Sequence, residues 1–462
     1  MLACFLPPDT TEAAVPVHAI AAADLAGTLD ALGPAARAWA GVAGFEAKAG
    51  THLLLPDEDG RLAGVLFGLG KPDGARTDML LGKLAGVLPP GAYRLATFEG
   101  DLDLALTAFA LGAYRFERYV APKETWPRLV LPSEADVLAI LRTAAAVHGV
   151  RDLVNTPAND LGTAELAAAV HALAAAHGAE IEEIVGDHLL AANYPLVHAV
   201  GAASARPPRL VTFTWGDPAA PKVTLVGKGV VFDTGGLNIK PDASMLLMKK
   251  DMGGAANVLG LARMVMEAGL SVRLRVVVPI VENSISGNAF RPGDVYRSRK
   301  GLTVEIGNTD AEGRLILADA LAFADEEAPE VLVDMATLTG AARVALGPDL
   351  PPVYTRDDDF AAELAAASAA VADPCWRLPL WPPYDDMLKS KIADVNHISG
   401  GSYAGSITAA LFLGRFVEKA RTWLHADIFA WTPSAKPASP EGGEAQVIRA
   451  LYAVLAARYG RR

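Results

Sequence analysis

At 462 residues, the chain exceeds the size of one ordinary domain and should form two or three. Of these residues, 52% are hydrophobic, and glycine and proline are frequent, a composition that indicates a large globular α/β protein and excludes a disordered or fibrous one. The formal net charge of −12 argues against a main role in nucleic-acid binding, because contact with phosphates requires a basic surface.

The chain opens with residues 1–8, which lack both the positive charges and the long apolar core of a signal peptide. The two cysteines, Cys4 and Cys375, lie far apart and do not amount to a disulfide framework, which is typical of proteins in a reducing cytosol. The alanine-rich run 361–372 is too short to span a bilayer. We therefore expect a cytoplasmic protein without membrane association.

Residues 1–130 are predicted to form a small N-terminal α/β domain. Short apolar runs at 51–56, 62–68 and 93–98 indicate strands, and alanine-rich helical segments lie between them. No group of catalytic or metal-binding residue types stands out in this part of the sequence, so its role is inferred by position alone.

Residues 131–160 are predicted to link this domain to a larger one. The stretch 122–132 is punctuated by prolines and charges, which is typical of a linker. Ser133, with Asp136 three residues later, has the pattern of a capping box. We therefore expect a connecting helix that begins there and ends before Pro157.

Residues 161–462 are predicted to form a catalytic domain around a central, mainly parallel sheet flanked by helices. A helix is expected at 163–177, where apolar residues recur at helical spacing before Gly178. Nearly continuous apolar runs predict buried strands with helical crossovers between them. The expected strands are 210–213, 223–226, 274–281, 331–335 and 423–428, and the clearest helices are 254–268 and 315–325. In such sheets ligands bind beyond the carboxyl ends of the strands.

A glycine-rich segment, 226–236, follows one of these strands and carries Lys228 and Asp233. It lacks the Gly-Lys-Ser/Thr ending of a phosphate-binding loop, so that interpretation is weak. Lys240 follows soon after, and Asp251 precedes the next expected helix. Each has an ordinary alternative, Lys240 as a solvated loop lysine and Asp251 as a helix cap that accepts a backbone N–H.

The stretch 308–315, Asn-Thr-Asp-Ala-Glu-Gly-Arg-Leu, places Asp310, Glu312 and Arg314 at alternate positions. Acids here are also typical of a helix start, where they complement the helix dipole. Carboxylates brought close together repel each other unless a cation lies between them, and a divalent metal ion is the usual one. With the upstream lysines and aspartates, this set favours ions such as Mn²⁺, Mg²⁺ or Zn²⁺, and two such ions require bridging carboxylates.

These motifs resemble those of the leucine aminopeptidase (cytosol aminopeptidase) family of two-metal exopeptidases. The matching segments are 226–236, Lys240, 251–254, 308–315, 334–341, 392–396 and 404–413, which together cover most of residues 150–430. The resemblance implies a metal-dependent aminopeptidase. Such an enzyme removes the N-terminal residue, leucine and similar ones, from peptides by attack of a water that bridges two divalent ions.

The resemblance also implies a set of metal ligands. Asp233 and Glu312 would bridge two ions, Mn²⁺ or Zn²⁺ with Mg²⁺ as a further candidate. Asp310 would complete the shell of one ion, and Lys228 and Asp251 that of the other. A lysine ligand must be neutral, so the ions and desolvation would have to lower its pKa. The substrate's free α-amine would bind the metal held by Lys228 and Asp251.

Two further residues would serve catalysis in the family pattern. Lys240 would stay charged and stabilise the oxyanion of the tetrahedral intermediate. Arg314 would hold a bicarbonate ion that moves the proton from the water to the leaving amine, and the motifs contain no histidine for that task. The positions that match the substrate pocket are Met248, Asn308, Thr337, Leu338 and Gly340. Ordinary packing is the alternative for Met248 and Leu338.

The end of the chain departs from the family pattern. Many relatives continue with a small residue after the strand at 423–428, whereas this chain has Phe-Ala-Trp at 429–431. With residues 440–446, this segment could border the specificity pocket, which leaves the preferred side chain open. His425 is expected to be a structural hydrogen-bonding residue rather than a ligand. The resemblance further implies a homohexamer of two trimers whose active sites face an interior cavity.

Three other functions compete with this interpretation. A nucleic-acid-binding regulator is disfavoured by the acidic net charge. A catalytically silent scaffold of the same fold is disfavoured because it has no use for a costly cluster of like charges. A two-metal phosphoesterase would require more basic residues near the site.

Overall fold

The structure is a computed structural model, and it describes residues 2–71, 78–121 and 125–460. The chain divides into two compact units. The first comprises Met1–His148 with Ser434–Glu441, and the second comprises Gly149–Pro433 with Gly442–Arg462. The boundary falls within helix α5 (Val137–Asn155). No helix in the described part of the chain has the length and apolar character needed to cross a membrane.

The first unit is built on a six-stranded mixed sheet with the strand order β1-β6-β5-β2-β4-β3. Strands β3 and β4 pair antiparallel, and the other neighbours pair parallel. Its elements are β1 (Phe5–Leu6), β2 (Val15–Ala21), η1 (Ala22–Asp24), α1 (Leu25–Leu32), α2 (Pro34–Val42), β3 (His52–Pro56), β4 (Leu62–Gly70), η2 (Asp78–Lys83), α3 (Leu84–Val87), β5 (Gly91–Thr97), α4 (Leu102–Gly112) and β6 (Pro127–Val130). The three strands expected in this unit correspond to β3, β4 and β5.

The stretch 122–132, expected to be a linker, contains strand β6 instead. Leu129 is fully buried, and Pro127 stands at the first position of the strand, where its missing N–H costs least. The linker interpretation was therefore wrong for 127–130. Residues 122–124 lie outside the described residues.

Helix α5 begins later than its capping pattern predicted. It starts at Val137, and the Asp136 carboxylate accepts the Ala139 N–H at 3.0 Å, so Asp136 is the capping residue. The backbone N–H of Asp136 donates to Asp103 at 3.0 Å, a long-range contact that holds this residue outside the helix. The Ser133 hydroxyl donates to Glu134 instead of capping. The expected end of the helix before Pro157 is confirmed.

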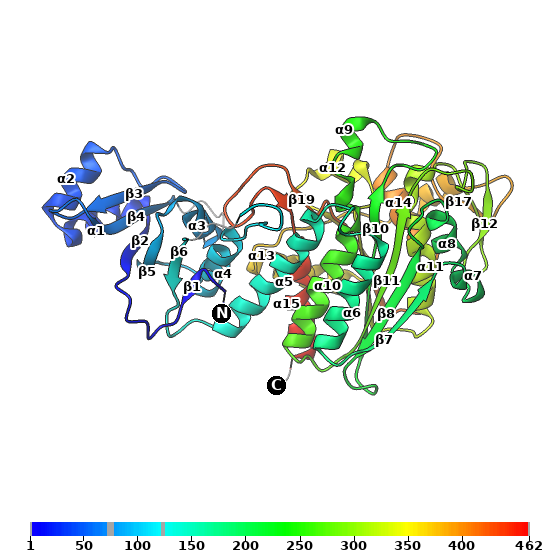
Figure 1. Cartoon of the computed structure of the whole chain (residues 1–462), viewed down its shortest axis with the longest axis horizontal. Helices are drawn as coiled ribbons and strands as arrows, with labels where there is room; N and C mark the ends of the chain where they lie inside the picture. The colour runs from blue at the N-terminus through cyan, green and yellow to red at the C-terminus, as the bar shows by residue number, and fades with distance from the viewer. Residues whose placement is uncertain (1, 72–77, 122–124, 461–462) are drawn as a thin grey trace. The chain divides into compact units, whose positions relative to one another are not determined.

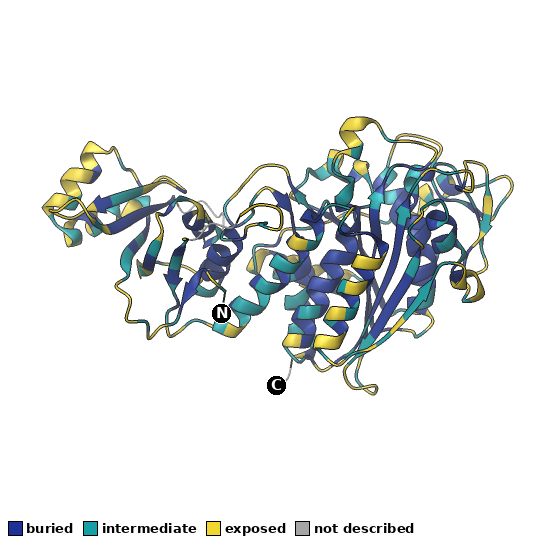
Figure 2. Cartoon of the chain, in the orientation of Figure 1, coloured by how far each residue is buried: buried dark blue, intermediate teal, exposed yellow. Residues whose placement is uncertain are grey.

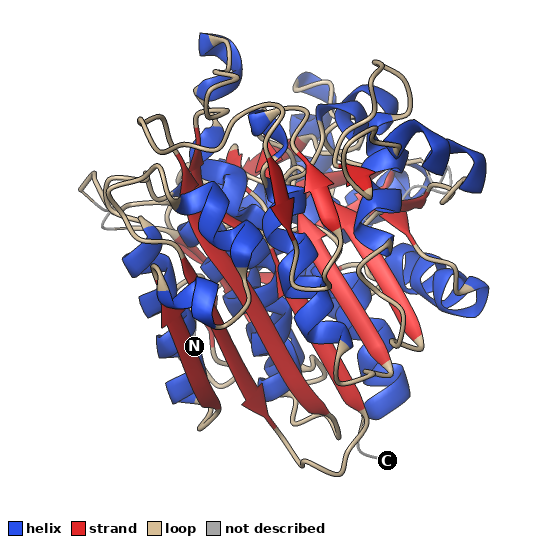
Figure 3. Ribbon diagram, turned by 90° about the vertical axis from the view of Figure 1, so that its right-hand side faces the viewer, coloured by secondary structure: helices blue, strands red, loops and turns tan. Residues whose placement is uncertain are grey.

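The second unit is built on a nine-stranded sheet with the order β16-β15-β18-β14-β9-β11-β8-β7, and β10 pairs with β11 beside this path. Its centre, β18-β14-β9-β11 with β10, is parallel, whereas β15, β8 and β7 are antiparallel to their inner neighbours. Figure 3 shows the strands lying side by side. The strands are β7 (Glu180–Val185), β8 (Arg209–Trp215), β9 (Lys222–Gly227), β10 (Gly229–Asp233), β11 (Arg273–Asn283), β14 (Val331–Ala336), β15 (Pro352–Tyr354), β16 (Trp376–Arg377) and β18 (Thr422–Asp427).

Helices cover both faces of this sheet, with α6 and α10 on one and α8 and α11 on the other (Figure 1). The helices of the unit are α6 (Thr163–Ala176), α7 (His188–Ala191), α8 (Pro195–Gly201), α9 (Asp242–Met245), η3 (Met248–Met252), α10 (Gly253–Glu267), η4 (Thr309–Ala311), α11 (Gly313–Asp325), α12 (Gly340–Leu346), α13 (Asp358–Ala370), η5 (Pro382–Leu388), α14 (Gly405–Gly414) and α15 (Ile448–Tyr459). Two small sheets add β12 (Val295–Arg297), β13 (Thr303–Glu305) and β17 (Val395–Asn396), and β19 (Trp431–Thr432) and β20 (Gly442–Gly443). The expected parallel sheet with helical crossovers is confirmed.

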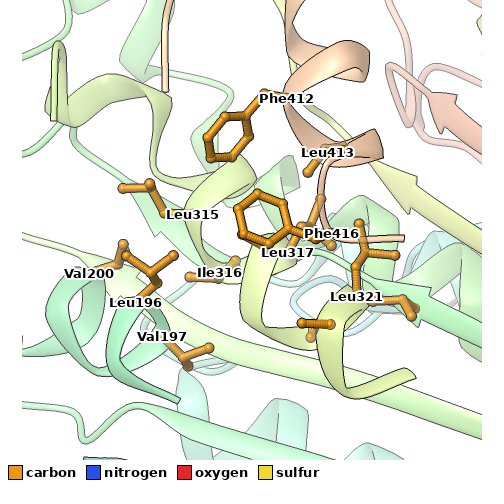
Figure 4. Close-up of a cluster of buried hydrophobic side chains, with 14 of the residues drawn as sticks. Leu196, Val197, Val200, Leu315, Ile316, Leu317, Leu321, Phe412, Leu413 and Phe416 are labelled. Carbon is orange, nitrogen blue, oxygen red and sulfur yellow. The ribbon is translucent and has the colours of Figure 1, made fainter. Parts of the chain in front are cut away.

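Helix α11 is anchored by a large apolar core on one face of the sheet (Figure 4). Leu315, Ile316, Leu317 and Leu321 of this helix have no solvent exposure and pack with side chains of α8 and α14. Figure 2 shows buried residues concentrated in the strands and on the helix sides that face them. Burial of each such side chain contributes about 1.5–3 kcal/mol, so the position of the α11 N-terminus is firmly set.

Candidate metal centre and substrate cavity

The predicted site residues lie at the carboxyl ends of the parallel strands, as expected for a sheet of this kind. Strand β9 ends directly before Lys228, β10 ends at Asp233, and β14 ends directly before Thr337. Asp251 lies in η3, next to the start of α10, and Asp310 lies in η4. Elements far apart in the sequence therefore meet at one edge of the sheet.

Lys228 is 3% exposed and lies between two carboxylates. Its Nζ is 2.7 Å from Asp251 Oδ2 and 2.9 Å from Glu312 Oε1, and it donates to the Thr337 carbonyl at 3.0 Å. Burial lowers the pKa of Lys228, but the surrounding carboxylates outweigh burial and raise that pKa above its usual value. A Cβ at Gly313 would lie 2.5 Å from Lys228 Cε, so glycine at this position makes room for the lysine.

Lys240 connects two other carboxylates at the cluster. Its Nζ is 2.8 Å from Asp233 Oδ2 and 2.5 Å from Asp310 Oδ1. The chain reaches this position through a tight turn at Gly235 and Gly236, whose φ angles are +88° and +64°. These angles fall in the left-handed region that glycine adopts without steric cost, so the two glycines allow Lys240 to return to Asp233.

Asp233, Asp310 and Glu312 each offer an oxygen within 4.8 Å of the others, the spacing of a metal-binding group. Burial raises the pKa of Asp233 well above its usual range, and repulsion from Glu312 and Asp251 raises it further. Burial likewise raises the pKa of Asp251 to about 6. The four carboxylates face only the two ammonium groups of Lys228 and Lys240 in these contacts, so negative charge is in excess.

The hydrogen bonding of Glu312 tests whether a cation fits this cluster. Glu312 is 1% exposed, and neither of its carboxylate oxygens accepts a hydrogen bond from a described residue. Its contact with Lys228 is an ion pair without hydrogen-bond geometry. Buried carboxylate oxygens need partners, and oxygen-rich donor sets are those that hard divalent ions prefer. The donor set therefore fits bound divalent cations.

Three residues support the site although the sequence analysis gave them no role in it. Asn283, at the end of β11, donates to Asp233 Oδ1 at 2.8 Å and to the Thr309 carbonyl at 3.0 Å. The Thr309 hydroxyl donates to the Gly235 carbonyl at 2.6 Å. These contacts join the loop that bears Asp233 to the loop that bears Asp310. The position of Asn283 at the end of an expected strand was the only available signal for it.

Arg314 is buried, with 7% of its surface exposed. It donates to the His397 carbonyl at 2.8 Å, and its Nε has no hydrogen-bond partner in the described part of the chain. Burial lowers its pKa to about 10. His397, the third missed residue, contacts the Asn308 carbonyl through Nε2 at 3.0 Å, and burial followed by the charge of Arg314 lowers its pKa to about 3.

A cavity of about 370 Å³ opens beside the cluster. Of the five predicted substrate-binding residues, Met248, Thr337, Leu338 and Gly340 line it. Asn308 is not among the lining residues, and its side chain accepts the Asp310 N–H at 2.8 Å. This contact caps η4 and positions Asp310, so the neighbouring carboxylate depends on Asn308 for its orientation. The metal-ligand candidates Lys228, Asp233, Asp251 and Asp310 line the same cavity, as does Lys240.

His425 lies in the sheet and does not line the cavity. Its Nδ1 is 2.5 Å from Asp334 Oδ1, and the Trp423 indole donates to Asp334 Oδ2 at 2.8 Å. The ring of Tyr354 stacks on the imidazole with centroids 5.7 Å apart. These contacts give His425 a structural role, in agreement with the expectation.

Two protein-family models match the chain over most of its length. The model described as the cytosol aminopeptidase family, catalytic domain, matches residues 148–452. The model described as the M17 aminopeptidase, N-terminal domain, matches residues 15–132. The catalytic-domain match begins at residue 148, where the first unit of the structure gives way to the second.

Individual proteins also resemble the chain in sequence and in fold. A probable cytosol aminopeptidase of Stenotrophomonas maltophilia is 42% identical over 408 residues, which cover 82% of this chain and 82% of the relative. The crystal structure of a cytosol aminopeptidase from Coxiella burnetii has 45% sequence identity and a TM-score of 0.94, with 99% of each chain covered. The bottromycin maturation enzyme BotP in complex with Mn has 34% identity and a TM-score of 0.87, with 96% of this chain and 99% of BotP covered.

Proposed function

The chain belongs to the cytosol aminopeptidase family, and from this premise we propose that the carboxylate–lysine cluster is its two-metal catalytic centre. The protein is a metal-dependent exopeptidase of the M17 leucyl aminopeptidase type, and its substrates are peptides. The observation that carries the proposal is the buried carboxylate of Glu312, whose Oε2 has no partner among the described residues and whose Oε1 has only the ion pair with Lys228.

The proposed metal ligands follow from the contacts within the cluster. Asp233 and Glu312 would bridge two ions, because oxygens of both lie within 4.8 Å of each other and of Asp310. Asp310 would complete one shell, and Lys228 with Asp251, now an ion pair at 2.7 Å, would complete the other. Lys228 would have to lose its proton to become a ligand. The complex of BotP with Mn supports Mn²⁺ as the ion, with Zn²⁺ and Mg²⁺ as alternatives.

The bound ions would supply a water of lowered pKa and Lewis acidity toward the peptide carbonyl. The residues around them would orient the substrate. The free α-amine of a peptide would lie at the end of the cavity formed by Lys228 and Asp251, which explains cleavage at the first residue only. Thr337 donates to Asp251 Oδ1 at 2.7 Å and keeps this carboxylate aimed at the cavity.

Lys240 is proposed as the oxyanion donor. It lines the cavity, and Asp233 and Asp310 hold it in place. Burial lowers the pKa of Lys240, but the carboxylates outweigh burial and raise that pKa above its usual value, so the group stays charged through the neutral range. A charged donor fixed at the position where negative charge develops lowers the barrier without reorganisation.

Arg314 is proposed as the residue that holds a bicarbonate ion. Its Nε is buried and free of hydrogen bonds to the described residues, whereas one Nη is fixed by His397. A guanidinium held on one side presents its other donors in a rigid fork that suits a planar anion. The anion would carry a proton toward the leaving amine, since none of the described residues that line the cavity is a histidine.

A hydrolysis assay with metal removal and readdition tests this proposal. The chelated protein should be inactive on L-leucine amide and on dipeptides, and Mn²⁺, Zn²⁺ or Mg²⁺ should restore activity, with calorimetry showing two ions bound per chain. A dipeptide with an acetylated N-terminus is the control and should not be cleaved. Preference for the blocked peptide would contradict the exopeptidase assignment, and activity that survives chelation would contradict the metal centre.

We further propose that the protein is a cytoplasmic homohexamer of two trimers. The support for the hexamer is membership of the family, and the support for the compartment is the name of the relatives, cytosol aminopeptidases. The acidic net charge of −12 disfavours the nucleic-acid-binding alternative. The excess of buried carboxylates disfavours a silent scaffold, because such a cluster is costly without its ions.

A further inference from the structure

One wall of the substrate cavity is cationic, although none of its charges takes part in the metal centre proposed above. We define this cationic wall by Lys250, Arg343 and Phe429, which all line the cavity. Lys250 Nζ lies 4.6 Å from the centroid of the Phe429 ring, and Arg343 Cζ lies 5.7 Å from it. Two positive side chains therefore flank one aromatic ring at the edge of the cavity.

Lys250 lacks the partner that a buried ammonium requires. It is 6% exposed, and the structure gives its Nζ no hydrogen bond or ion pair to any described residue, only the contact with the Phe429 ring. A cation–aromatic contact satisfies the charge in part but accepts none of the three N–H donors. The ammonium is thus free to donate to a group that enters the cavity.

Arg343 is only partly paired. Its Nη2 contacts Asp427 Oδ1 at 2.9 Å, whereas Nε and Nη1 are buried without a hydrogen-bond partner in the described part of the chain. Asp427 also accepts the backbone N–H groups of Leu338 and Thr339 and the Thr339 hydroxyl. Its oxygens are therefore shared among several donors, and Nε and Nη1 of Arg343 remain without an acceptor among the described residues.

The wall is held rigidly in place. The side-chain oxygen of Gln446 accepts the N–H groups of Phe429 and Ala430 at 2.8 and 3.0 Å. Ala430 has a φ of +54°, a left-handed conformation that costs an alanine about 1–2 kcal/mol. A strained backbone that is fixed by specific hydrogen bonds is typical of functional sites, and here it aims the Phe429 ring at the cavity.

From this geometry we infer that the cationic wall recognises the side chain of the substrate's first residue and that this side chain is a carboxylate, as in N-terminal aspartate or glutamate. The inference rests on the proposed function, since an α-amine held near Lys228 and Asp251 places the first side chain beside the neighbouring Lys250. A leucine side chain would leave the donors of Lys250 and Arg343 desolvated and unpaired, which is costly. A carboxylate would satisfy donors of both cations.

Substrates of nearly the same shape but different charge, glutamate and glutamine amides, test whether the wall recognises a negative charge. The Mn²⁺-loaded enzyme should hydrolyse L-glutamate α-amide with a kcat/KM at least about 10-fold above those of L-glutamine amide and L-leucine amide, since a hydrogen bond to a charged group is worth that much. A ratio of glutamate to glutamine near one, or a preference for alanine amide, would overturn the inference. Alanine amide would have the highest kcat/KM if the Phe429 ring only fills the pocket and leaves room for a small side chain. Absence of hydrolysis of every amide would instead contradict the proposed function.

Two variants and one control test whether the preference for glutamate arises from the cationic wall. Lys250→Met and Arg343→Met should each reduce the glutamate-to-glutamine ratio about 10- to 100-fold, mainly through KM. Lys249→Met is the matched control, because Lys249 donates to the Asn155 carbonyl at 2.7 Å and does not line the cavity. It should keep the wild-type ratio. Wild-type ratios in both cavity variants would refute the role of the wall.

A binding measurement keeps the inference testable if a variant does not fold. Calorimetry on the metal-loaded wild-type enzyme should show that free L-glutamate, a product analogue, binds at least about 10-fold more tightly than L-glutamine. The difference should persist as salt is added, because salt screens buried charges much less than exposed ones. Equal affinities at low salt would contradict a cationic subsite without any use of the variants.

Discussion

The two lysines of the proposed metal centre contact carboxylates in similar ways but are proposed to do different chemistry. Both lysines line the cavity, but the Lys228 side chain is 4% exposed between Asp251 and Glu312, whereas that of Lys240 is 12% exposed between Asp233 and Asp310. Exposure explains the difference. A fully buried amine among ions can lose its proton, whereas an amine at the cavity edge keeps its charge and can meet the substrate.

Replacement of Lys240 or Asp310 should abolish hydrolysis without loss of the fold. Lys240→Ala removes the proposed oxyanion donor, which typically costs about 100- to 1,000-fold in kcat. Asp310→Asn removes one anionic ligand and should weaken metal binding, as calorimetry would show. Circular dichroism should remain that of the wild type. Turnover at the wild-type rate in either variant would contradict the assignment of these residues.

His397 should make stability depend on pH below neutrality. Burial and Arg314 lower its pKa to about 3, so the folded protein keeps the imidazole neutral while the unfolded chain binds a proton near pH 6.5. The stabilisation is complete above that value and is lost as pH falls toward 3, with a slope of about 1.4 kcal/mol per pH unit. Denaturant unfolding from pH 7 to 4 would measure it.

The matched variants for this measurement are His397→Gln and His188→Gln. The first should flatten the pH dependence of the unfolding free energy by the contribution of one proton. His188 is exposed, so its replacement should leave the profile as in the wild type. A wild-type slope in His397→Gln would show that other groups carry the acid sensitivity.

At the scale of elements, short segments that follow strands determine what the cavity can recognise. The segment after β18 carries Phe429, and the segment before α15 carries Gln446, which holds it. Gln446 also donates to the Pro348 carbonyl at 2.8 Å, and its N–H donates to Asn257 at 2.8 Å. One glutamine thus joins three segments, and the shape of the cavity depends on it.

Gln446→Ala should destabilise the protein and loosen the cavity wall. It leaves the N–H groups of Phe429 and Ala430 without their acceptor, at a cost of about 1–3 kcal/mol each if no water replaces it. The free energy of unfolding should fall accordingly, and KM should rise for substrates that contact Phe429. Glu441→Ala, at an exposed position nearby, is the control and should change stability by less than about 0.5 kcal/mol. Equal stability of both variants would contradict this role of Gln446.

At the scale of the whole molecule, the proposed hexamer makes a direct prediction of mass. Native mass spectrometry should give a mass near six times the 48.2 kDa of one chain. Dilution into the nanomolar range tests the stability of the hexamer, since closed symmetric assemblies with large interfaces persist at such concentrations. A monomer or dimer at micromolar concentration would refute the proposed hexamer while leaving the metal chemistry of each chain untouched.

The negative net charge predicts that the protein does not bind nucleic acid. With a net charge of −12, it should not be retained on immobilised duplex DNA even at about 50 mM salt, where electrostatic binding is strong. The Mn²⁺-loaded protein should be used, so that the ions in the cluster are in place. Retention that falls steeply with added salt would revive the regulatory alternative, because that dependence is the signature of phosphate contacts.

The sequence by itself identified the residues of the candidate centre, which the structure brings together, and the core strands of the larger sheet. The candidate residues were identified because their types suit metal binding and because their motifs resemble those of a known family. They are Lys228, Asp233, Lys240, Asp251 and the acids and arginine of 308–315. The expected strands of the larger unit were identified because strands buried on both faces are continuously apolar, and all of them except β8 pair in parallel at the centre of the sheet. Motifs and apolar runs consist of residues close together in the chain, so they can be recognised in a single sequence.

Only the tertiary structure decided what depends on distant contacts. The start of α5 shifted from Ser133 to Asp136 because Asp103 binds the Asp136 backbone, and β6 formed in the supposed linker because a sheet was there to bury Leu129. Asn283 and His397 support the centre from segments that carry no motif. The cationic wall unites Lys250, Arg343 and Phe429 from three separate elements. Their proximity follows from packing of the sheet and its helices, which no local pattern encodes.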